Sequence, residues 1–376
     1  MTNAEIAIRR MQNQRITATD FERPDQAVQW MGAMQAQDYQ QALWAVALRT
    51  KAATQADVEA AITNRQIVLS WPMRGTIHVV AAADLRWMLE LCAPRRLAGD
   101  ASRLRQLELD DRSLGRCAAI FSAALEGGQV LTRSALLGLM SSIGIDPSGQ
   151  RGYHVLWRLA QTGLLCFGPK EGKEQTFTLL EEWIAPQLHK SRDEALTGLA
   201  ERYVTSHGPA TAEDFAGWTG LTLTEARAGL ESLRTDLTTF KRDGREYWWS
   251  EQALEPISKS VPIASVFSVS LLPGFDEYLL GYKDRRDVLA GEHAPRVVPG
   301  GNGVFLPMIV MHGGVDDGQV VGTWQRTVKK KGVAITLHPF LEIGRLKERV
   351  QEASTRYCAF LGMPLLSFQT LDRELT

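Results

Sequence analysis

Apolar positions along the chain follow two spacings, and these alternate in a fixed order. Stretches with an apolar stripe at helical spacing are followed by two short β-like runs joined by a glycine-containing turn, and this arrangement occurs three times before residue 256. Such a repeated order predicts three consecutive units of one architecture.

The predicted elements of the three units share these patterns. Thr54 with Asp57 forms a capping-box pattern that predicts a helix start. Helical spacing predicts further helices at 25–34, 41–49, 131–140, 153–161, 211–218 and 222–233. The β-like runs predict hairpin strands at 67–71 and 76–80, 164–167 and 175–179, and 237–242 and 246–249.

The pattern changes after residue 255, where β-rich runs dominate and an amphipathic helix follows. The runs lie at 261–272, 303–311, 319–327 and 333–339, and the helix at 345–361. Helices followed by a β-hairpin are the layout of a winged helix, a helix-turn-helix variant. We therefore predict an α+β fold with three tandem winged-helix units and a C-terminal β-barrel-like domain, at 1–115, 116–190, 191–255 and 256–376.

Composition excludes several classes of protein. The chain has 376 residues, 44% of them hydrophobic, with 42 Lys and Arg against 43 Asp and Glu, which is not the balance of a disordered, collagen-like or disulfide-stapled chain. No apolar run approaches the ~20 residues of a membrane-spanning helix, and no export signal is visible, so we expect a soluble, cytoplasmic protein without a membrane partner. We expect reduced, buried thiols at Cys92, Cys117, Cys166 and Cys358.

The charge does not decide whether nucleic acid is a partner. A formal net charge of −1 lacks the basic excess that is typical of DNA-binding domains. Charge can be local, however, because four arginines face one aspartate between residues 95 and 105. A DNA-binding protein of this composition needs one basic face, with its carboxylates placed elsewhere.

Sequence motifs for the common cofactors are absent. The chain has no G-x-x-x-x-G-K-[ST] loop and no G-x-G-x-x-G after a predicted strand. The seven histidines lack metal-ligand spacing, and Ser, Cys and His form no nucleophile pattern. We therefore expect neither a cofactor nor a metal ion.

An unusual polar patch lies at Met34-Gln35-Ala36-Gln37-Asp38. Gln35 and Gln37 would lie on nearly opposite sides of an α-helix, because two residues rotate by about 200°, but on the same side of an extended backbone. If they act together, this segment lies where a helix ends, and Asp38 caps the next helix. Residue chemistry alone favours the alternative, in which both glutamines only satisfy backbone groups at a helix junction.

Several segments spread over most of the chain resemble one known family. They are Met34–Asp38, Met73–His78, Pro273–Leu280, Tyr282–Arg285 and Gly322–Trp324. In this order they resemble the AlkZ-like winged-helix DNA glycosylases, and Gln35-Ala36-Gln37 matches the Gln-apolar-Gln catalytic motif of that family. The resemblance implies tandem winged helices, a C-terminal β-barrel and monofunctional excision of alkylated bases. It also implies unhooking of interstrand crosslinks, which the namesake branch performs.

The resemblance implies catalytic roles for Gln35 and Gln37, whose amide oxygens would hold a water near C1′. An N7-alkylguanine or N3-alkyladenine already carries positive charge, so the base leaves without a strong general acid while the enzyme stabilises an oxocarbenium-like sugar. Asp38 is a secondary candidate, as a base. The competing class is a non-enzymatic winged-helix transcriptional regulator.

The expected partner is double-stranded DNA with alkylated bases, bound by a monomer through phosphate contacts, so that the protein associates with the nucleoid when bound. The candidate DNA-binding residues are Arg74, His78, Arg95, Arg96, Lys283, Arg285, Asn302, Lys329 and Lys330. By resemblance, a hairpin of the C-terminal domain enters the minor groove, and its tip is either 300–305 or 313–318.

Overall fold

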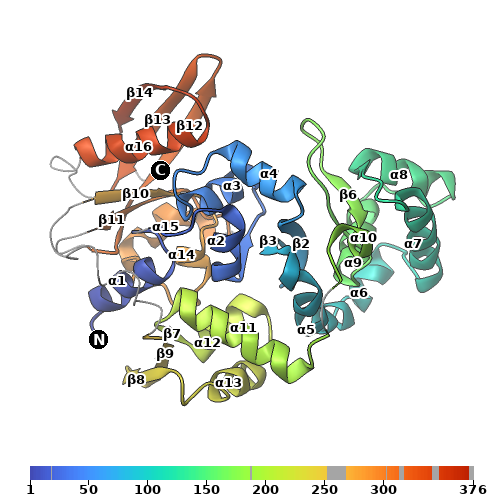
Figure 1. The fold of residues 1–376 in the computed structure, drawn as a ribbon, viewed down its shortest axis with the longest axis horizontal. Coiled ribbons are helices and arrows are strands. Elements are labelled where there is room, and N and C mark those ends of the chain that lie inside the picture. Colours follow the sequence, from blue (N-terminus) through green and yellow to red (C-terminus); the bar gives the residue numbers. More distant parts are fainter. Residues whose placement is uncertain are drawn as a thin grey trace.

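The structure is a computed structural model that describes residues 1–17, 19–186, 189–251, 268–301, 303–312, 317–340 and 347–371 (Figure 1). The described helices are α1 (Asn3–Asn13), α2 (Pro24–Met31), α3 (Tyr39–Leu48), α4 (Gln55–Thr63), α5 (Leu85–Ala98), α6 (Ala101–Gln106), α7 (Asp111–Leu125), α8 (Arg133–Ser142), α9 (Arg151–Gln161), α10 (Leu180–Trp183), α11 (Arg192–His207), α12 (Ala212–Thr219), α13 (Leu223–Glu231), α14 (Glu277–Leu280), α15 (Ala294–Val297) and α16 (Lys347–Phe360). The described strands are β1 (Ala33–Gln35), β2 (Ile67–Met73), β3 (Thr76–Ala81), β4 (Leu131–Thr132), β5 (Leu165–Phe167), β6 (Thr176–Leu179), β7 (Ala210–Thr211), β8 (Thr238–Arg242), β9 (Arg245–Trp249), β10 (Ser268–Leu272), β11 (Met308–His312), β12 (Val320–Lys329), β13 (Gly332–Pro339) and β14 (Leu365–Thr370).

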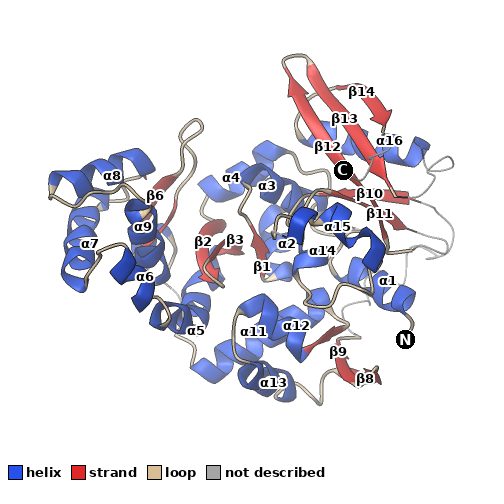
Figure 2. Ribbon diagram, turned by 180° about the vertical axis from the view of Figure 1, so that it is seen from behind, coloured by secondary structure: helices blue, strands red, loops and turns tan. Residues whose placement is uncertain are grey.

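One order of elements occurs three times: a helix, a short strand, two helices and a hairpin. The first copy runs from α2 to β3, the second from α7 to β6 and the third from α11 to β9. In each copy the short strand pairs antiparallel with the last strand of the hairpin, which gives the orders β1-β3-β2, β4-β6-β5 and β7-β9-β8. Figure 2 shows the first of these sheets near the middle of the molecule. The described residues thus form three small sheets of identical strand order in an α+β fold.

Local sequence determines where the helices begin and end. The capping box predicted at Thr54 is formed, because its hydroxyl accepts from the Asp57 N–H and its own N–H donates to the Asp57 carboxylate at 2.8 Å. The helix predicted to reach Met34 instead ends at Met31, since Gly32 adopts a φ of 79° and the next residues pair as β1. A strand of two or three residues is too short to leave a period in the sequence.

Within the described residues the C-terminal part forms an open sheet, and no sheet closes into the predicted barrel. Its strand order is β10-β11-β12-β13-β14, and among the described residues β10 and β14 do not pair with each other. Helices cover its apolar face: the Tyr357 ring of α16 lies 4.9 Å from Trp324 of β12 and 5.1 Å from Trp44 of α3. Because helices already bury this face, the sheet does not have to close on itself.

Two β-rich runs predicted in this part differ from the observed strands. The run predicted at 303–311 forms a strand only from Met308, directly after Pro307. The run predicted at 261–272 is observed as β10 from Ser268, and 261–267 lies outside the described residues.

A buried ion pair joins the first repeat to the C-terminal part. Arg49 follows α3 and Asp276 precedes α14, and their side chains meet at 2.8 Å with no exposed surface. Arg49 also donates to the Ala45 carbonyl and to both oxygens of Gln14, so all its N–H groups are used. Because a buried charge requires a partner, this pair fixes α14 against the first repeat.

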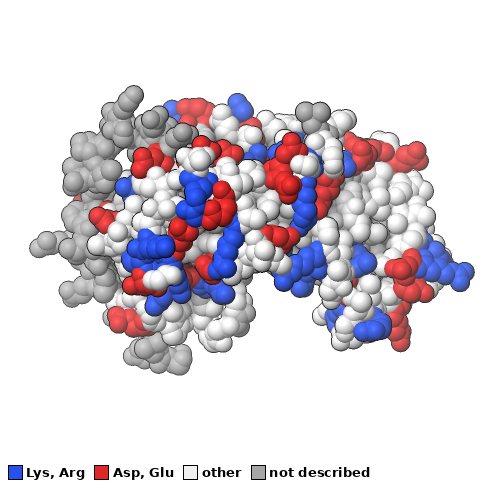
Figure 3. All heavy atoms as spheres, turned by 90° about the horizontal axis from the view of Figure 1, so that it is seen from below, with Lys and Arg blue, Asp and Glu red and all other residues white. Residues whose placement is uncertain are grey.

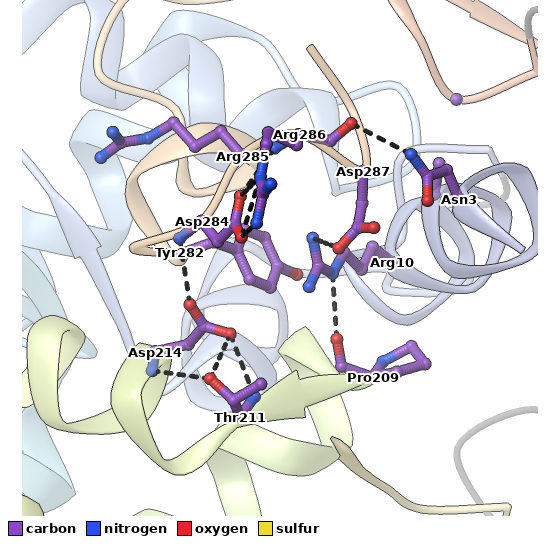
Figure 4. A network of polar contacts seen from close by, with 12 residues as sticks. Asn3, Arg10, Pro209, Thr211, Asp214, Tyr282, Asp284, Arg285, Arg286 and Asp287 are labelled. Atoms are coloured by element: carbon purple, nitrogen blue, oxygen red, sulfur yellow. Dashed lines mark hydrogen bonds and ion pairs between the residues drawn. The ribbon is translucent and has the colours of Figure 1, made fainter. Parts of the chain in front are cut away.

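A second polar network holds the segment 282–287 from two sides (Figure 4). Asp214 of α12 accepts a hydrogen bond from the Lys283 N–H at 2.8 Å. Arg10 of α1 pairs with Asp287 at 3.3 Å. The segment is therefore fixed relative to both the N-terminal helix and the third repeat.

Further observations concern cysteines, membrane spans and metals. The four cysteines are buried and free, as predicted. Within the described part of the chain, no helix combines the length and apolar character needed to cross a bilayer. In the same ranges, no group of three or more His, Cys, Asp and Glu side chains is arranged to hold a metal ion.

Replacing Arg49 by methionine removes one partner of the buried pair while keeping much of the side-chain volume. Asp276 is then a buried carboxylate without its cation, and we expect the free energy of unfolding to fall by about 3–5 kcal/mol in urea denaturation. Lys51→Met breaks the exposed pair with Glu22 and is the matched control, which should leave the midpoint nearly unchanged. Equal losses in both variants would contradict the role of the buried pair.

Candidate active site

The segment with the two glutamines connects the end of α2 to the start of α3. Gln35 ends β1 and lies opposite His78 of β3, while Asp38 caps α3 by accepting from the Gln41 N–H at 3.2 Å. The predicted position at a helix end and the predicted cap are both confirmed. Gln35 is half-buried, and Gln37 is exposed.

The turn between β2 and β3 places Arg74 beside Gln35. Arg74 and Gly75 have positive φ values of 56° and 74°, as a two-residue hairpin turn requires. Gly75 also permits close approach, since a Cβ there would lie 3.2 Å from Trp157 Nε1, which donates to the Gly75 carbonyl at 3.1 Å. A left-handed conformation costs a non-glycine residue about 1–2 kcal/mol, so the surroundings hold Arg74 in this position.

Arg74 donates from one nitrogen, Nη2, to two acceptors. These are Gln35 Oε1 at 3.1 Å and His78 Nε2 at 3.2 Å. His78 Nδ1 lies 2.8 Å from the Thr76 carbonyl oxygen, which can only accept. Since a guanidinium can only donate, the network assigns His78 as a neutral imidazole with its proton on Nδ1.

Burial and the positive charge of Arg74 lower the pKa of His78 to about 4. The imidazole is fully buried, so desolvation disfavours its protonated form. At neutral pH His78 therefore acts as an acceptor that orients Arg74, and any link between His78 and DNA runs through that arginine.

A carboxylate that the sequence analysis did not single out contacts the backbone of Gln35. Glu277 Oε1 accepts from the Gln35 N–H at 2.8 Å, and Oε2 accepts from Trp218 Nε1 at 2.9 Å. The Glu277 side chain is 1% exposed. The signal available in the sequence is the pair of carboxylates at 276 and 277 within an otherwise apolar stretch.

Gln35 contacts one negative and one positive side chain. Burial opposes ionisation of Glu277, but the neighbouring His207 and the Arg74 guanidinium outweigh it and hold the pKa of Glu277 at about 2. His207 Nε2 lies 3.7 Å from the carboxylate, and burial lowers the pKa of His207 in turn. Glu277 is therefore ionised at neutral pH.

Among the described residues, each side-chain oxygen of the two glutamines has one protein donor. Gln37 Oε1 accepts from the Ile77 N–H at 3.2 Å, just as Gln35 Oε1 accepts from Arg74. An amide oxygen accepts two hydrogen bonds, so each keeps one acceptor position for water or substrate. If the glutamines only satisfied neighbouring groups at the helix junction, that role would use one acceptor position on each amide oxygen. The second acceptor position on each oxygen stays free.

A cavity of about 410 Å³ lies against Arg74. Lys283 and Arg285 line it together with Arg74, and Glu213 is the carboxylate in the lining. Apolar residues such as Leu280 form other parts of the wall. Three cations against one carboxylate favour an anionic group in this cavity.

Two further predicted basic residues lie near the first hairpin turn. Arg95 donates to the Gly220 carbonyl at 3.1 Å, and a Cβ on Gly220 would lie 3.3 Å from Arg74 Cγ. The Arg96 guanidinium lies 6.0 Å from the Trp157 ring centroid. The structure thus places Arg95 and Arg96 of α5 next to the turn that carries Arg74.

Two of the remaining predicted residues, Lys329 and Lys330, are not brought to this region. Lys329 and Lys330 are exposed at the turn between β12 and β13, and none of the described contacts links them to Gln35. Asn302 lies outside the described residues, as does 313–316 of the second predicted hairpin tip.

Figure 3 shows a face of the molecule that is hollowed along one edge. The hollow lies between the part formed by α7–α9 and the rest of the molecule, and Lys and Arg side chains border it. Basic and acidic side chains are mixed over much of the remaining face. The near-zero net charge therefore coexists with a local basic border.

Comparisons with known proteins agree with one another. The family model of AlkZ-like DNA glycosylases matches residues 28–360. A curated relative, an interstrand DNA cross-link repair glycosylase of Streptomyces sahachiroi, is 27% identical over 336 residues and covers 87% of this chain and 87% of that protein. The solved structure of Streptomyces sahachiroi DNA glycosylase AlkZ aligns with a TM-score of 0.78 and 26% identity, over 99% of this chain and 100% of that chain.

The pKa of His78, lowered from 6.5 to about 4, makes the free energy of unfolding depend on pH. The unfolded chain binds a proton below pH 6.5 that the folded protein binds only near pH 4, so this contribution is complete above pH 6.5 and falls by about 3 kcal/mol on acidification. NMR titration should give a midpoint near 4 in the wild type and a higher one in Arg74→Gln, with His78→Gln identifying the signal. A wild-type midpoint near 6.5 would contradict the network.

Proposed function

Since the chain belongs to the AlkZ-like DNA glycosylase family, we propose that it is a monofunctional glycosylase that hydrolyses the N-glycosidic bond of cationic alkylated purines. The observation that carries this proposal is the Gln35–Gln37 pair: Arg74 and Ile77 orient the two amides, and Arg74 also lines a cavity with two further cations. The relative described above is a cross-link repair glycosylase, and we extend the proposal to the unhooking of interstrand crosslinks.

The positive charge of the leaving base explains why the neutral amides of two glutamines suffice for the proposed reaction. N7-alkylguanine and N3-alkyladenine are already cationic, so the bond to the sugar breaks without protonation of the leaving base. The free acceptor positions of Gln35 and Gln37 hold a water near C1′ and favour the positive charge that develops on the sugar. Because the leaving group needs neither a strong acid nor a Lewis acid, the proposed reaction proceeds without a metal ion.

Asp38 takes a structural part in this proposal. Its carboxylate accepts the Gln41 N–H as the cap of α3, which also fixes the end of the segment that carries Gln37. A carboxylate occupied in this way is a weaker candidate for the base than a water held by the glutamines.

DNA binding in this proposal uses the repeated units. The order of helix, short strand, two helices and hairpin supports their interpretation as winged helices at 1–115, 116–190 and 191–255, followed by a C-terminal domain at 256–376. Arg74, Lys283 and Arg285 would take a strand phosphate in the cavity between them. Three units in one chain remove the need for a dimer, so we propose a monomer on duplex DNA.

A regulator that only binds DNA is the competing proposal. It gives no purpose to two glutamine amides that protein donors orient and that keep a second acceptor position for water. Incubation with methylated DNA separates the two classes, because only a glycosylase releases the free base.

Single-turnover release of 7-methylguanine tests the assigned roles. Gln35→Ala and Gln37→Ala should each lower the rate by about a hundredfold, because the water loses one of the two groups that hold it. Asp38→Asn keeps a side-chain oxygen for the cap and should retain most of the activity. Loss of turnover in Asp38→Asn alone would show that the carboxylate, and not the glutamine pair, carries the chemistry.

Uracil in DNA tests the dependence on a cationic leaving group. A neutral base needs protonation on departure, and the proposed site contains no general acid for it, so the wild type should release 7-methylguanine but not uracil at equal enzyme and DNA concentrations. Free base measured by chromatography is the readout. Uracil release at a comparable rate would exclude this mechanism.

A further inference from the structure

Two side chains of opposite charge contact Gln35, and the water-positioning step proposed above assigns no role to their charges. Glu277 contacts the main chain of Gln35 at 2.8 Å, and Arg74 contacts its side-chain oxygen at 3.1 Å. Glu277 comes from α14 of the C-terminal part, and Arg74 comes from the hairpin turn of the first repeat. Two distant segments therefore meet at one glutamine.

Without a compensating negative charge, the positive charge of Arg74 would destabilise the transition state of the proposed reaction. Gln35 would face a sugar that becomes positive in the transition state, and a guanidinium on the other side of the same amide repels that charge. Arg74 is nevertheless needed to orient the Gln35 side-chain amide, because its N–H donates to Oε1 and so determines where the amide oxygen lies. A site that uses Arg74 in this way requires a nearby negative charge.

We propose that Glu277 is a positioning residue that fixes the Gln35 backbone and supplies the negative charge that compensates Arg74. The inference rests on the proposed glycosylase function and deepens it, because it identifies how the site tolerates a cationic sugar. Glu277 is 1% exposed, so it acts through Gln35 and not by contact with substrate. The ionised carboxyl, with its pKa held at about 2, agrees with this role.

The other groups around Glu277 leave the balance between these two charges intact. Trp218 donates a neutral N–H to the second carboxylate oxygen. Burial lowers the pKa of His78 and of His207, which disfavours a further positive charge beside Glu277. Arg285 lines the cavity that is proposed to take the phosphate.

The test compares two abasic-site duplexes that differ only in the charge of the sugar ring. One carries a cationic pyrrolidine in place of the sugar, and the other carries a neutral tetrahydrofuran. The ratio of their dissociation constants measures how strongly the site prefers a positive charge at the position of the sugar. A variant that weakens binding of both duplexes equally leaves this ratio unchanged. The wild type should bind the pyrrolidine duplex more tightly.

The two single variants should move this ratio in opposite directions. Glu277→Gln keeps an oxygen for the Gln35 N–H but leaves Arg74 uncompensated, so the preference for pyrrolidine should fall on the order of tenfold. Arg74→Gln leaves Glu277 uncompensated, so the preference should rise on the order of tenfold. The double variant restores neutrality and should return the ratio to near the wild-type value.

Asp287→Asn is the matched control, because Asp287 is also buried and paired with arginines but lies in the network around Arg10 and Arg242. It should lower the melting temperature without changing the ratio. Unchanged ratios in both single variants, or shifts in the same direction, would overturn the proposal. If Glu277→Gln does not fold, the sign of the shift in Arg74→Gln decides.

A failure of the proposed function gives a different result. If the wild type shows no preference for pyrrolidine and releases no 7-methylguanine, the glycosylase assignment itself fails. If the wild type releases 7-methylguanine and prefers pyrrolidine but the variants leave that preference unchanged, only the role of Glu277 is overturned.

Discussion

Two adjacent buried carboxylates, Asp276 and Glu277, set the constraint on which the rest of the structure depends. A buried charge is tolerated only when partners compensate it, and here the partners come from distant parts of the chain. Arg49 pairs with Asp276, while the Gln35 N–H and Trp218 bind Glu277. Satisfying both carboxylates places α14 against the first and third repeats. The contact that joins the parts of the molecule is thus also the contact that fixes Gln35.

The same constraint explains how a chain of net charge −1 can have a cationic cavity. Carboxylates such as Asp276 and Asp287 are buried in ion pairs, where they contribute little to the field at the surface. Arg74 and Lys283, in contrast, line a cavity, and Arg74 links this cavity to Gln35. Net charge counts both groups equally, so it reports little about the local field that a DNA strand would meet.

Patterns of short range were predictable from the sequence, and contacts between distant segments were not. A few neighbouring residues determine the cap at Asp38 and the capping box at Thr54. They also determine that a helix ends before Gln35. The open sheet was missed because barrel closure depends on whether another element covers the apolar face, which no strand pattern reveals. Glu277 was missed because its role depends on a hydrogen bond across 242 positions of the chain.

A crystal structure of the wild type with the pyrrolidine abasic duplex tests the central claim most directly. The account predicts that the pyrrolidine ring lies next to Gln35 and Gln37, with a water hydrogen-bonded to both amide oxygens and the contacts of Arg74 and Glu277 to Gln35 unchanged. A neighbouring strand phosphate should occupy the cavity lined by Lys283 and Arg285. A pyrrolidine ring bound elsewhere on the protein, with neither glutamine near it, would contradict the account.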